Sequence, residues 1–372
     1  MTAWHRVVAS LAVASCVIAG IEAQHARYPL PRESARFSDA IDRGRALVTG
    51  LITAKQIPGF SVAVAVDGRV VWSEGFGVAD AEQFVAVTPM TRFRVGSVSK
   101  LFTAAAVARL VQEGRLDLDA PVQRYVPGFP KKPWPITTRQ LTSHTAGIRH
   151  YAGDLQGVLS SSPHFASVTA GLTIFQEDPL LFEPSTSYSY SSYGWNLVSA
   201  VVEGAAHTEF LTYLQREIFE PLNLRNTAAD HVDAITPHRT RFYRREGATL
   251  LHAPYQDSSY KWAGGGLLSN ADDLVRFGSA HLQPGFFKQR TLDLLFTSQR
   301  LRSGKDTGVG IAWRIGTDAK GRRIVHHGGT IDGGRTMVMA FPESKVVVAM
   351  LANLLVDFGE REAQQLGDLF IP

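Results

Sequence analysis

Ser97 and Lys100 lie three residues apart at the start of an apolar-periodic stretch, and this pair has the clearest chemical potential in the sequence. On a helix, residues three apart share one face, so the hydroxyl and the amine would be neighbours. A serine becomes a nucleophile when a nearby base takes its proton, and lysine is such a base only if burial or another cation lowers its pKa. The pair predicts acyl chemistry, although serine at a helix start is also a common N-cap.

The same spacing occurs a second time, at Ser258 and Lys261. This copy follows residues 253–257, which are typical of a loop, and it precedes the glycines of residues 264–266. Without a helix to hold the two side chains on one face, we expect the second copy to have no chemical role.

Tyr190 and Ser192 lie in a segment rich in tyrosine and serine, residues 182–195. A tyrosine phenol can act as a proton shuttle when cations lower its pKa. The alternative is that the tyrosines of this segment are half-buried packing residues with a hydrogen-bonded hydroxyl. The segment alone does not decide between the two interpretations.

His326 and His327 end an apolar stretch and are followed by Gly328 and Gly329. A histidine can donate to an oxyanion or to a substrate carboxylate, and glycines let a substrate approach a strand closely. The alternatives are a simple strand end with a turn, or a pair of metal ligands. Adjacent residues on a strand point to opposite faces, and no further ligands follow at zinc spacing, so we expect no metal.

The chain has 372 residues, of which 45% are hydrophobic, and a formal net charge of +4 at pH 7. This apolar content is sufficient for a large core, and we expect a single domain with two lobes over residues 24–372. No cluster of lysine and arginine stands out, which indicates a solvated surface and no nucleic-acid partner.

The N-terminus predicts export. The apolar stretch over residues 7–21 follows a single arginine, is short for a membrane span and precedes Ala23, so residues 1–23 resemble a secretory signal peptide. Residues 13–16 also resemble a lipoprotein processing site, which would leave a lipidated Cys16 as a membrane attachment. A third alternative is that the apolar stretch is not cleaved and stays as a membrane anchor. We expect a periplasmic or secreted protein. Cleavage after Ala23 would remove the only cysteine and leave no disulfide.

Period-2 patterns predict strands at both ends of the chain, and helical patterns fill the middle. The expected fold class is α+β, with a central antiparallel sheet built from both chain ends, terminal helices on one face and a helical lobe on the other. The expected strands are residues 60–66, 69–76, 309–315, 323–327, 335–341 and 345–352, and the expected helices include 37–56, 98–113, 193–205, 209–219, 271–282 and 358–370.

Together these motifs resemble the serine beta-lactamase and penicillin-binding superfamily, in its class C branch. That branch also holds D-Ala-D-Ala carboxypeptidases, family VIII esterases and mitochondrial beta-lactamase-like serine proteases. The resemblance covers roughly residues 37–370 and implies the beta-lactamase/transpeptidase-like fold. Its motifs follow the family order at residues 93–100, 141–148, 184–195, 219–227, 263–273 and 326–329.

The resemblance implies a role for each site residue. Ser97 is expected to be acylated, with Lys100 and Tyr190 sharing the proton transfers. The backbone N–H groups of Ser97 and Gly329 would form the oxyanion hole. His326 would lie near Tyr190, where it polarises the phenol or binds a substrate carboxylate. The reaction needs no metal or organic cofactor. The remaining expected contacts to the substrate are Ser192 and Gly328.

Two departures from the family pattern bear on the substrate. Ser192 replaces an asparagine that helps hold the lysine and the substrate amide, and serine can make fewer such contacts. His326 replaces the lysine of the K-T-G motif, as is usual in esterases and peptidases of this branch. We expect a serine hydrolase acting on an ester or peptide. The alternatives are a true class C-like beta-lactamase that takes lactams, a silent penicillin-sensing module and a self-assembling structural protein.

Overall fold

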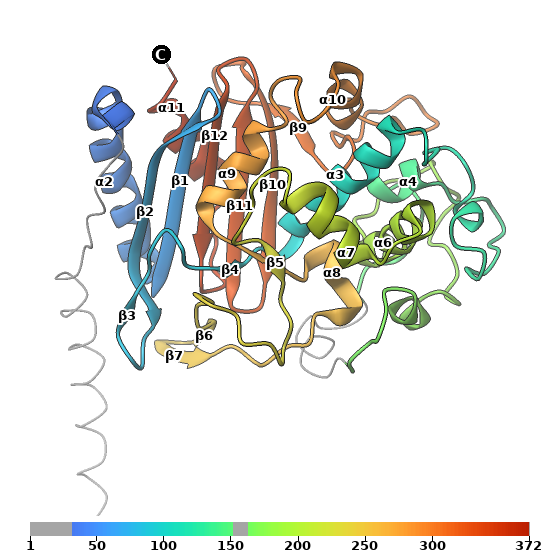
Figure 1. Cartoon of the computed structure of the whole chain (residues 1–372), viewed down its shortest axis with the longest axis horizontal. Coiled ribbons are helices and arrows are strands. Elements are labelled where there is room, and N and C mark those ends of the chain that lie inside the picture. The colour runs from blue at the N-terminus through green and yellow to red at the C-terminus, as the bar shows by residue number, and fades with distance from the viewer. Residues whose placement is uncertain (1–31, 152–162, 372) are drawn as a thin grey trace, which may run out of the picture.

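A seven-stranded antiparallel sheet runs through the computed structural model, which describes residues 32–151 and 163–371 (Figure 1). The strand order is β3-β2-β1-β12-β11-β10-β9, so the first and last long strands of the chain pair at its centre. The strands are β1 (Gly59–Val66), β2 (Arg69–Asp80), β3 (Val85–Ala86), β9 (Arg314–Thr317), β10 (Arg323–Ile331), β11 (Gly334–Phe341) and β12 (Val346–Ala352).

Both faces of the sheet are buried, as the alternation along β1 shows. Val62 and Val64 pack into one apolar cluster, whereas Ala63 and Ala65 pack into the other. Successive side chains of a strand point to opposite faces, so one strand contributes to two cores. Small alanines on the second face allow the lobe to approach the sheet closely.

The terminal helices α2 (Ser38–Lys55) and α11 (Glu360–Asp368) cover one face (Figure 1). Phe370 packs between this layer and the sheet, since the centre of its ring lies 5.8 Å from that of Phe37 and 6.1 Å from that of Trp72. The other face is covered by α9 (Ala271–Ser279) and by the helical lobe. This arrangement confirms the expected fold class.

Helix α3 (Ser99–Gln112) is buried along most of its length in the middle of the lobe. It ends before Gly114, whose φ of +71° is a conformation that glycine adopts without strain. The other lobe helices are α4 (Thr138–Thr142), α6 (Ser192–Ala206), α7 (Phe210–Leu214), α8 (Trp262–Gly265) and α10 (Gln289–Leu295), and the minor sheets contain β4 (Phe93–Arg94), β5 (Ala228–Ala229), β6 (Tyr243–Glu246), β7 (Thr249–His252) and β8 (Leu267–Ser269).

Three local expectations need correction. The helix expected over 209–219 changes after α7 into a π-helical turn, Gln215–Phe219. The strand expected over 309–315 begins only at Arg314. Val309 lies outside it and forms only an isolated β-bridge with Arg314. The segment of the second serine–lysine pair is a 3-10 turn, Ser259–Lys261, that continues into α8, and not an open loop.

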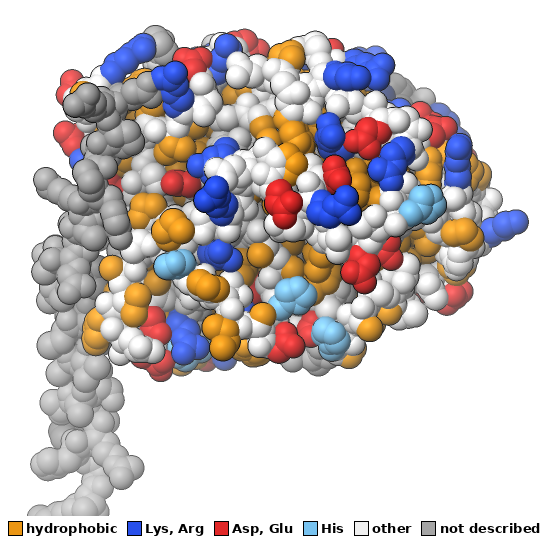
Figure 2. Space-filling view, viewed as in Figure 1, with side chains coloured by type: hydrophobic (Ala, Val, Ile, Leu, Met, Phe, Trp, Pro, Cys, Tyr) orange, Lys and Arg blue, Asp and Glu red, His pale blue; other side chains and the backbone are white. Residues whose placement is uncertain are grey.

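The expected signal peptide, residues 1–23, lies outside the described residues. Within the part that the structure does describe, no helix is both long and apolar enough to cross a membrane. Figure 2 shows basic and acidic side chains interspersed on the face seen in Figure 1.

Candidate active site

Ser97 lies in a 3-10 turn, Gly96–Val98, that leads directly into α3. Gly96 has a φ of +50°, and a Cβ there would lie 2.9 Å from the backbone of Thr330 on β10. Only glycine meets both demands, because it tolerates a positive φ and has no Cβ to clash. The turn therefore holds Ser97 against the edge of the main sheet.

Lys100 follows one turn later and is completely buried. Its Nζ lies 3.1 Å from Ser97 Oγ, 3.1 Å from Ser192 Oγ and 2.5 Å from the carbonyl oxygen of Gly264. Burial lowers the pKa of this lysine well below its usual value, and the nearby Arg314 guanidinium lowers it further. A neutral amine is thus accessible beside the serine.

Tyr190 directs its hydroxyl at Ser97 Oγ, to which it donates a hydrogen bond of 2.8 Å. Ser191 caps the following helix α6 by accepting from Gly194 N at 2.9 Å, and this cap fixes the chain direction beside Tyr190. Burial raises the pKa of Tyr190, while the hydrogen bond to Ser97 and the charge of Arg314 oppose the rise. The phenol therefore keeps its proton at neutral pH.

Two histidines flank Tyr190, and neither was expected in the site from the sequence. The ring centroids of His144 and His150 lie 4.3 and 5.4 Å from that of Tyr190. Their Nδ1 atoms accept hydrogen bonds from the backbone N–H groups of Ser191 and Ser192, both at 3.1 Å. Burial lowers the pKa of His150 to about 4, so its ring is neutral at pH 7. His144 lies within the family-like loop, residues 141–148, and this motif was the sequence feature that could have placed it in the site.

Arg314, on β9, was also not expected in the site from the sequence. Its guanidinium lies 6.0 Å from the centre of the Tyr190 ring and lines the same cavity as Ser97. The residue belongs to a short strand with no recognisable motif. Its position depends on the pairing of β9 with β10, which no local pattern encodes.

The two histidines of β10 point to opposite faces, and the structure corrects the choice between them. His327 is buried beside Lys100 and lines the cavity, with its Nδ1 2.7 Å from the carbonyl oxygen of Gly328. His326 faces α11, where its Nδ1 lies 3.6 Å from Glu360. The expectation for His326 was therefore wrong by one strand position, which reverses the direction of a side chain.

The two glycines of β10 have different surroundings. Gly328 lines the cavity. A Cβ on Gly329 would overlap the carbonyl of Val95 and lie 3.4 Å from Ser97 N. The strand can approach the nucleophile turn this closely only because residue 329 is a glycine.

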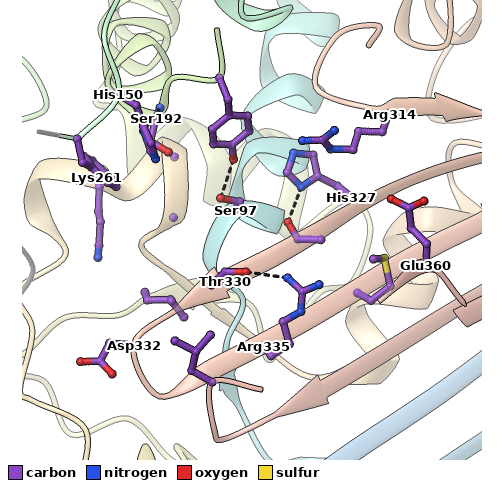
Figure 3. Close-up of a pocket in the computed structure, with 18 residues that line it drawn as sticks. Ser97, His150, Ser192, Lys261, Arg314, His327, Thr330, Asp332, Arg335 and Glu360 are labelled. Atoms are coloured by element: carbon purple, nitrogen blue, oxygen red, sulfur yellow. Dashed lines mark hydrogen bonds between the residues drawn. The ribbon is translucent and has the colours of Figure 1, made fainter. Parts of the chain in front are cut away.

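The cavity around Ser97 has a volume of about 430 Å³ (Figure 3). Of the seven site residues expected from sequence, Ser97, Tyr190, Ser192 and Gly328 line it directly, and Lys100 lies buried beneath Ser97. Within residues 32–151 and 163–371, no three His, Cys, Asp or Glu side chains group as a metal site.

The two residues of the second serine–lysine pair have different surroundings. Ser258 is completely buried, and its hydroxyl has no hydrogen-bond partner in the part of the chain that the structure describes. Lys261, however, lines the same cavity as Ser97. The pair therefore does not repeat the arrangement of Ser97 and Lys100, but its lysine reaches the site.

The sequence and the fold of the chain match known proteins. The family described as Beta-lactamase matches residues 44–369. The chain belongs to the Beta-lactamase family. The mitochondrial serine beta-lactamase-like protein LACTB of Homo sapiens is similar to this family member, with 31% identity over 407 aligned positions that cover 85% of this chain and 74% of the human one.

Solved structures of the Beta-lactamase fold overlay on most of the chain. The octameric penicillin-binding protein homologue from Pyrococcus abyssi is 23% identical and matches with a TM-score of 0.73, covering 84% of this chain and 73% of that one. EstCE1, a hydrolase with promiscuous acyltransferase activity, is 22% identical, also with a TM-score of 0.73, and covers 91% and 100% of the two chains. At these identities the likeness shows a shared fold.

Proposed function

We propose that the protein is a serine hydrolase that forms an acyl-enzyme on Ser97 and hydrolyses an ester or a peptide bond. The observation that carries this proposal is the placement of Lys100 and Tyr190 at 3.1 and 2.8 Å from one serine hydroxyl. Both groups lie at hydrogen-bond distance from the atom whose proton must move, which is the geometric requirement for acid–base catalysis.

Lys100 suits the role of base. A neutral amine has two N–H donors and one lone pair, and three partners surround this Nζ. Gly264 O and Ser192 Oγ can accept the two N–H groups, which leaves the lone pair for the Ser97 hydroxyl. Burial favours this neutral form.

Tyr190 suits the role of proton relay. Because its raised pKa keeps the phenol protonated, it can support Ser97 Oγ and then give a proton to the departing group. Ser97 Oγ bonds to the substrate carbonyl carbon while its proton passes to Lys100, and the bond to the leaving group breaks as that group receives a proton. Water then attacks the ester on Ser97 by the reverse transfers and regenerates the hydroxyl.

The negative charge on the carbonyl oxygen needs donors nearby. Ser97 N opens the helical segment, and Gly329 of β10 is packed against it. We propose that these two backbone N–H groups form the oxyanion hole, in agreement with the role that the family resemblance implies.

The residues at two positions, 192 and 327, favour ester or peptide substrates over lactams. Ser192 offers a hydroxyl where an amide would hold a lactam side chain, and it is already hydrogen-bonded to Lys100. On β10 the residue facing the cavity is His327, whose pKa burial lowers well below its usual value, so it presents a neutral ring and not an ammonium. Each lost polar contact costs about 1–3 kcal/mol.

A substrate panel tests this function. In one buffer, kcat/KM is compared for p-nitrophenyl butyrate, D-Ala-D-Ala peptides and nitrocefin, and intact-mass spectrometry follows covalent adducts of a fluorophosphonate and of penicillin. We expect labelling at Ser97, the best turnover with an ester or peptide, and slow hydrolysis of any penicillin adduct. Nitrocefin turnover far above the other two would identify a beta-lactamase, and a protein without adduct or turnover would favour a silent sensing or structural module.

A further inference from the structure

Lys261 faces the cavity of Ser97 but takes no part in the proton transfers described above. It ends the 3-10 turn before α8, is 2% exposed and lines the cavity wall. In Figure 3, Lys261 and Asp332 lie on one side of Ser97, whereas Arg314, Arg335 and Glu360 lie on the other. The cavity therefore has a separate cation at the end away from the arginines.

Among the described residues, no carboxylate forms an ion pair with the Lys261 ammonium, and no residue forms a hydrogen bond with it. The buried Asp230 nearby is already paired, since Arg94 lies 2.7 Å and Arg239 3.2 Å from its oxygens. Asp332 favours the charged form of the lysine, but no ion pair between the two is described. The Lys261 ammonium lies 5.3 Å from the centre of the Tyr260 ring, a weaker interaction than an ion pair. A buried ammonium without a counter-ion is costly, and such groups in cavities are often ones that bind a ligand.

The two arginines at the opposite end of the cavity already have partners within the protein. Arg335 donates through Nε to Phe358 O at 2.8 Å and through Nη1 to Thr330 Oγ1 at 2.7 Å. Arg314 packs against the ring of Tyr190. Lys261 is thus the cation at the other end of the cavity, where neither arginine lies.

We infer that Lys261 binds a carboxylate carried by the substrate, so that the substrate class is esters or amides with a free acid group at this end of the cavity. This inference rests on the proposed hydrolase function. A carboxylate would supply the missing counter-ion and accept hydrogen bonds from the ammonium.

The charge of Lys261 depends on pH in a way that supports this role. Burial, with the charge of Arg94, lowers the pKa of Lys261 to about 7; Lys100 acts in the same direction, whereas Asp230 and Asp332 oppose the change. Below that value the empty site holds an ammonium, and above it the charge is lost. Preference for an acidic substrate should therefore weaken as the pH rises.

The test uses two esters that differ only in charge, p-nitrophenyl hydrogen glutarate and p-nitrophenyl methyl glutarate. The measured quantity is the ratio of kcat/KM for the acid to that for the neutral ester. We expect wild-type enzyme to favour the acid at about pH 6 and to lose most of that preference at about pH 8. Lys261→Met should lower the ratio at about pH 6 by about tenfold or more. The matched control Lys305→Met, at an exposed lysine, should leave the ratio unchanged.

Two outcomes would overturn the inference. A ratio that is the same in wild type and Lys261→Met would show that this lysine binds no substrate charge. A ratio that falls in Arg335→Met but not in Lys261→Met would place the carboxylate at the other end. If Lys261→Met does not fold, inhibition of the wild-type enzyme by free glutarate gives the answer: it must exceed inhibition by glutaramide and weaken between about pH 6 and about pH 8.

The same data separate this inference from the proposed function. Neutral-ester turnover and fluorophosphonate labelling of Ser97 report the hydrolase, whereas the ratio reports Lys261. Turnover and labelling with an unchanged ratio refute only the carboxylate site, and absence of both refutes the hydrolase itself.

Discussion

Tyr190 donates a hydrogen bond of 2.8 Å to Ser97 Oγ from a different part of the lobe, just before α6. Ser97 belongs to the turn before α3, so the contact joins two helices at the edge of the sheet. The site therefore exists only when α3, α6 and β10 have packed together.

Removal of the nucleophile should abolish the chemistry. We expect Ser97→Ala to stop ester hydrolysis and covalent labelling, with a loss on the order of 4 kcal/mol or more in transition-state stabilisation. The fold should survive, as circular dichroism would show. Ser258→Ala is the matched control, because Ser258 shares the spacing to a lysine but does not line the cavity. An adduct that persists in Ser97→Ala, or a comparable loss in Ser258→Ala, would mean that another serine is acylated.

Removal of the Tyr190 hydroxyl should slow proton transfer. We expect Tyr190→Phe to lower kcat by roughly a hundredfold or more, since acid–base groups contribute about that much. Tyr188→Phe and Tyr193→Phe are controls from the same segment, and neither residue is hydrogen-bonded to Ser97 among the described contacts. If all three variants lose similar activity, packing of the segment and not proton transfer would account for the effect.

The pH profile of neutral-ester hydrolysis should follow Lys100. Lysine must be neutral to accept the proton of Ser97, so kcat/KM should rise with pH through its lowered pKa. Arg314→Gln removes a nearby positive charge and should raise that pKa, which moves the acid limb to higher pH by up to about one unit. His326→Gln should not move this limb, because His326 faces α11 and burial lowers its own pKa. A limb that shifts with His326 and not with Arg314 would contradict the assignment.

A core histidine should make stability depend on pH. His281 is buried against aromatic rings, including those of Phe277 and Trp313, and burial lowers its pKa from 6.5 to about 4. The unfolded state binds the proton more tightly, so stability contributed by the neutral ring is present above 6.5 and lost as the pH falls towards 4. The difference is about 3 kcal/mol.

Urea unfolding at several pH values tests this linkage. His281→Phe should show a shallower loss of unfolding free energy between about pH 6.5 and about pH 4 than the wild type. His207→Asn is the control, because His207 is exposed in a left-handed C-cap that asparagine also tolerates. Equal slopes in wild type and His281→Phe would show that this ring does not control the acid stability.

We propose that the protein is exported, and the mature N-terminus should show it. Residues 7–21 and Ala23 predict cleavage before Gln24, and a lipidated Cys16 is the alternative product. Mass spectrometry of the purified N-terminal peptide distinguishes the two. Recovery of Met1 on a soluble cytoplasmic protein would argue against both forms of export.

The parts of the site that sequence could predict are those encoded locally. Ser97 and Lys100 are one helical turn apart, so their spacing alone places them together. Tyr190 followed from its segment and the family resemblance. The sheet was also predictable, because period-2 apolar patterns mark strands at both chain ends.

The parts that sequence missed depend on contacts between distant elements. Arg314 reaches the site through the pairing of β9 with β10, and His150 through a hydrogen bond to the backbone of Ser192. The choice between His326 and His327 depended on strand register, where a shift of one residue exchanges the two faces. Lys261 was visible as a motif, but its place in the cavity depended on the 3-10 turn that carries it.

The pairing of β1 with β12 has a consequence for how the chain folds during synthesis. Phe60 pairs with Ala352, so the centre of the sheet cannot close until almost the whole chain has left the ribosome. Contacts of such long sequence separation slow folding. The nascent chain therefore lacks a complete sheet for most of its synthesis, and the apolar residues of β1 stay uncovered until β12 has been made.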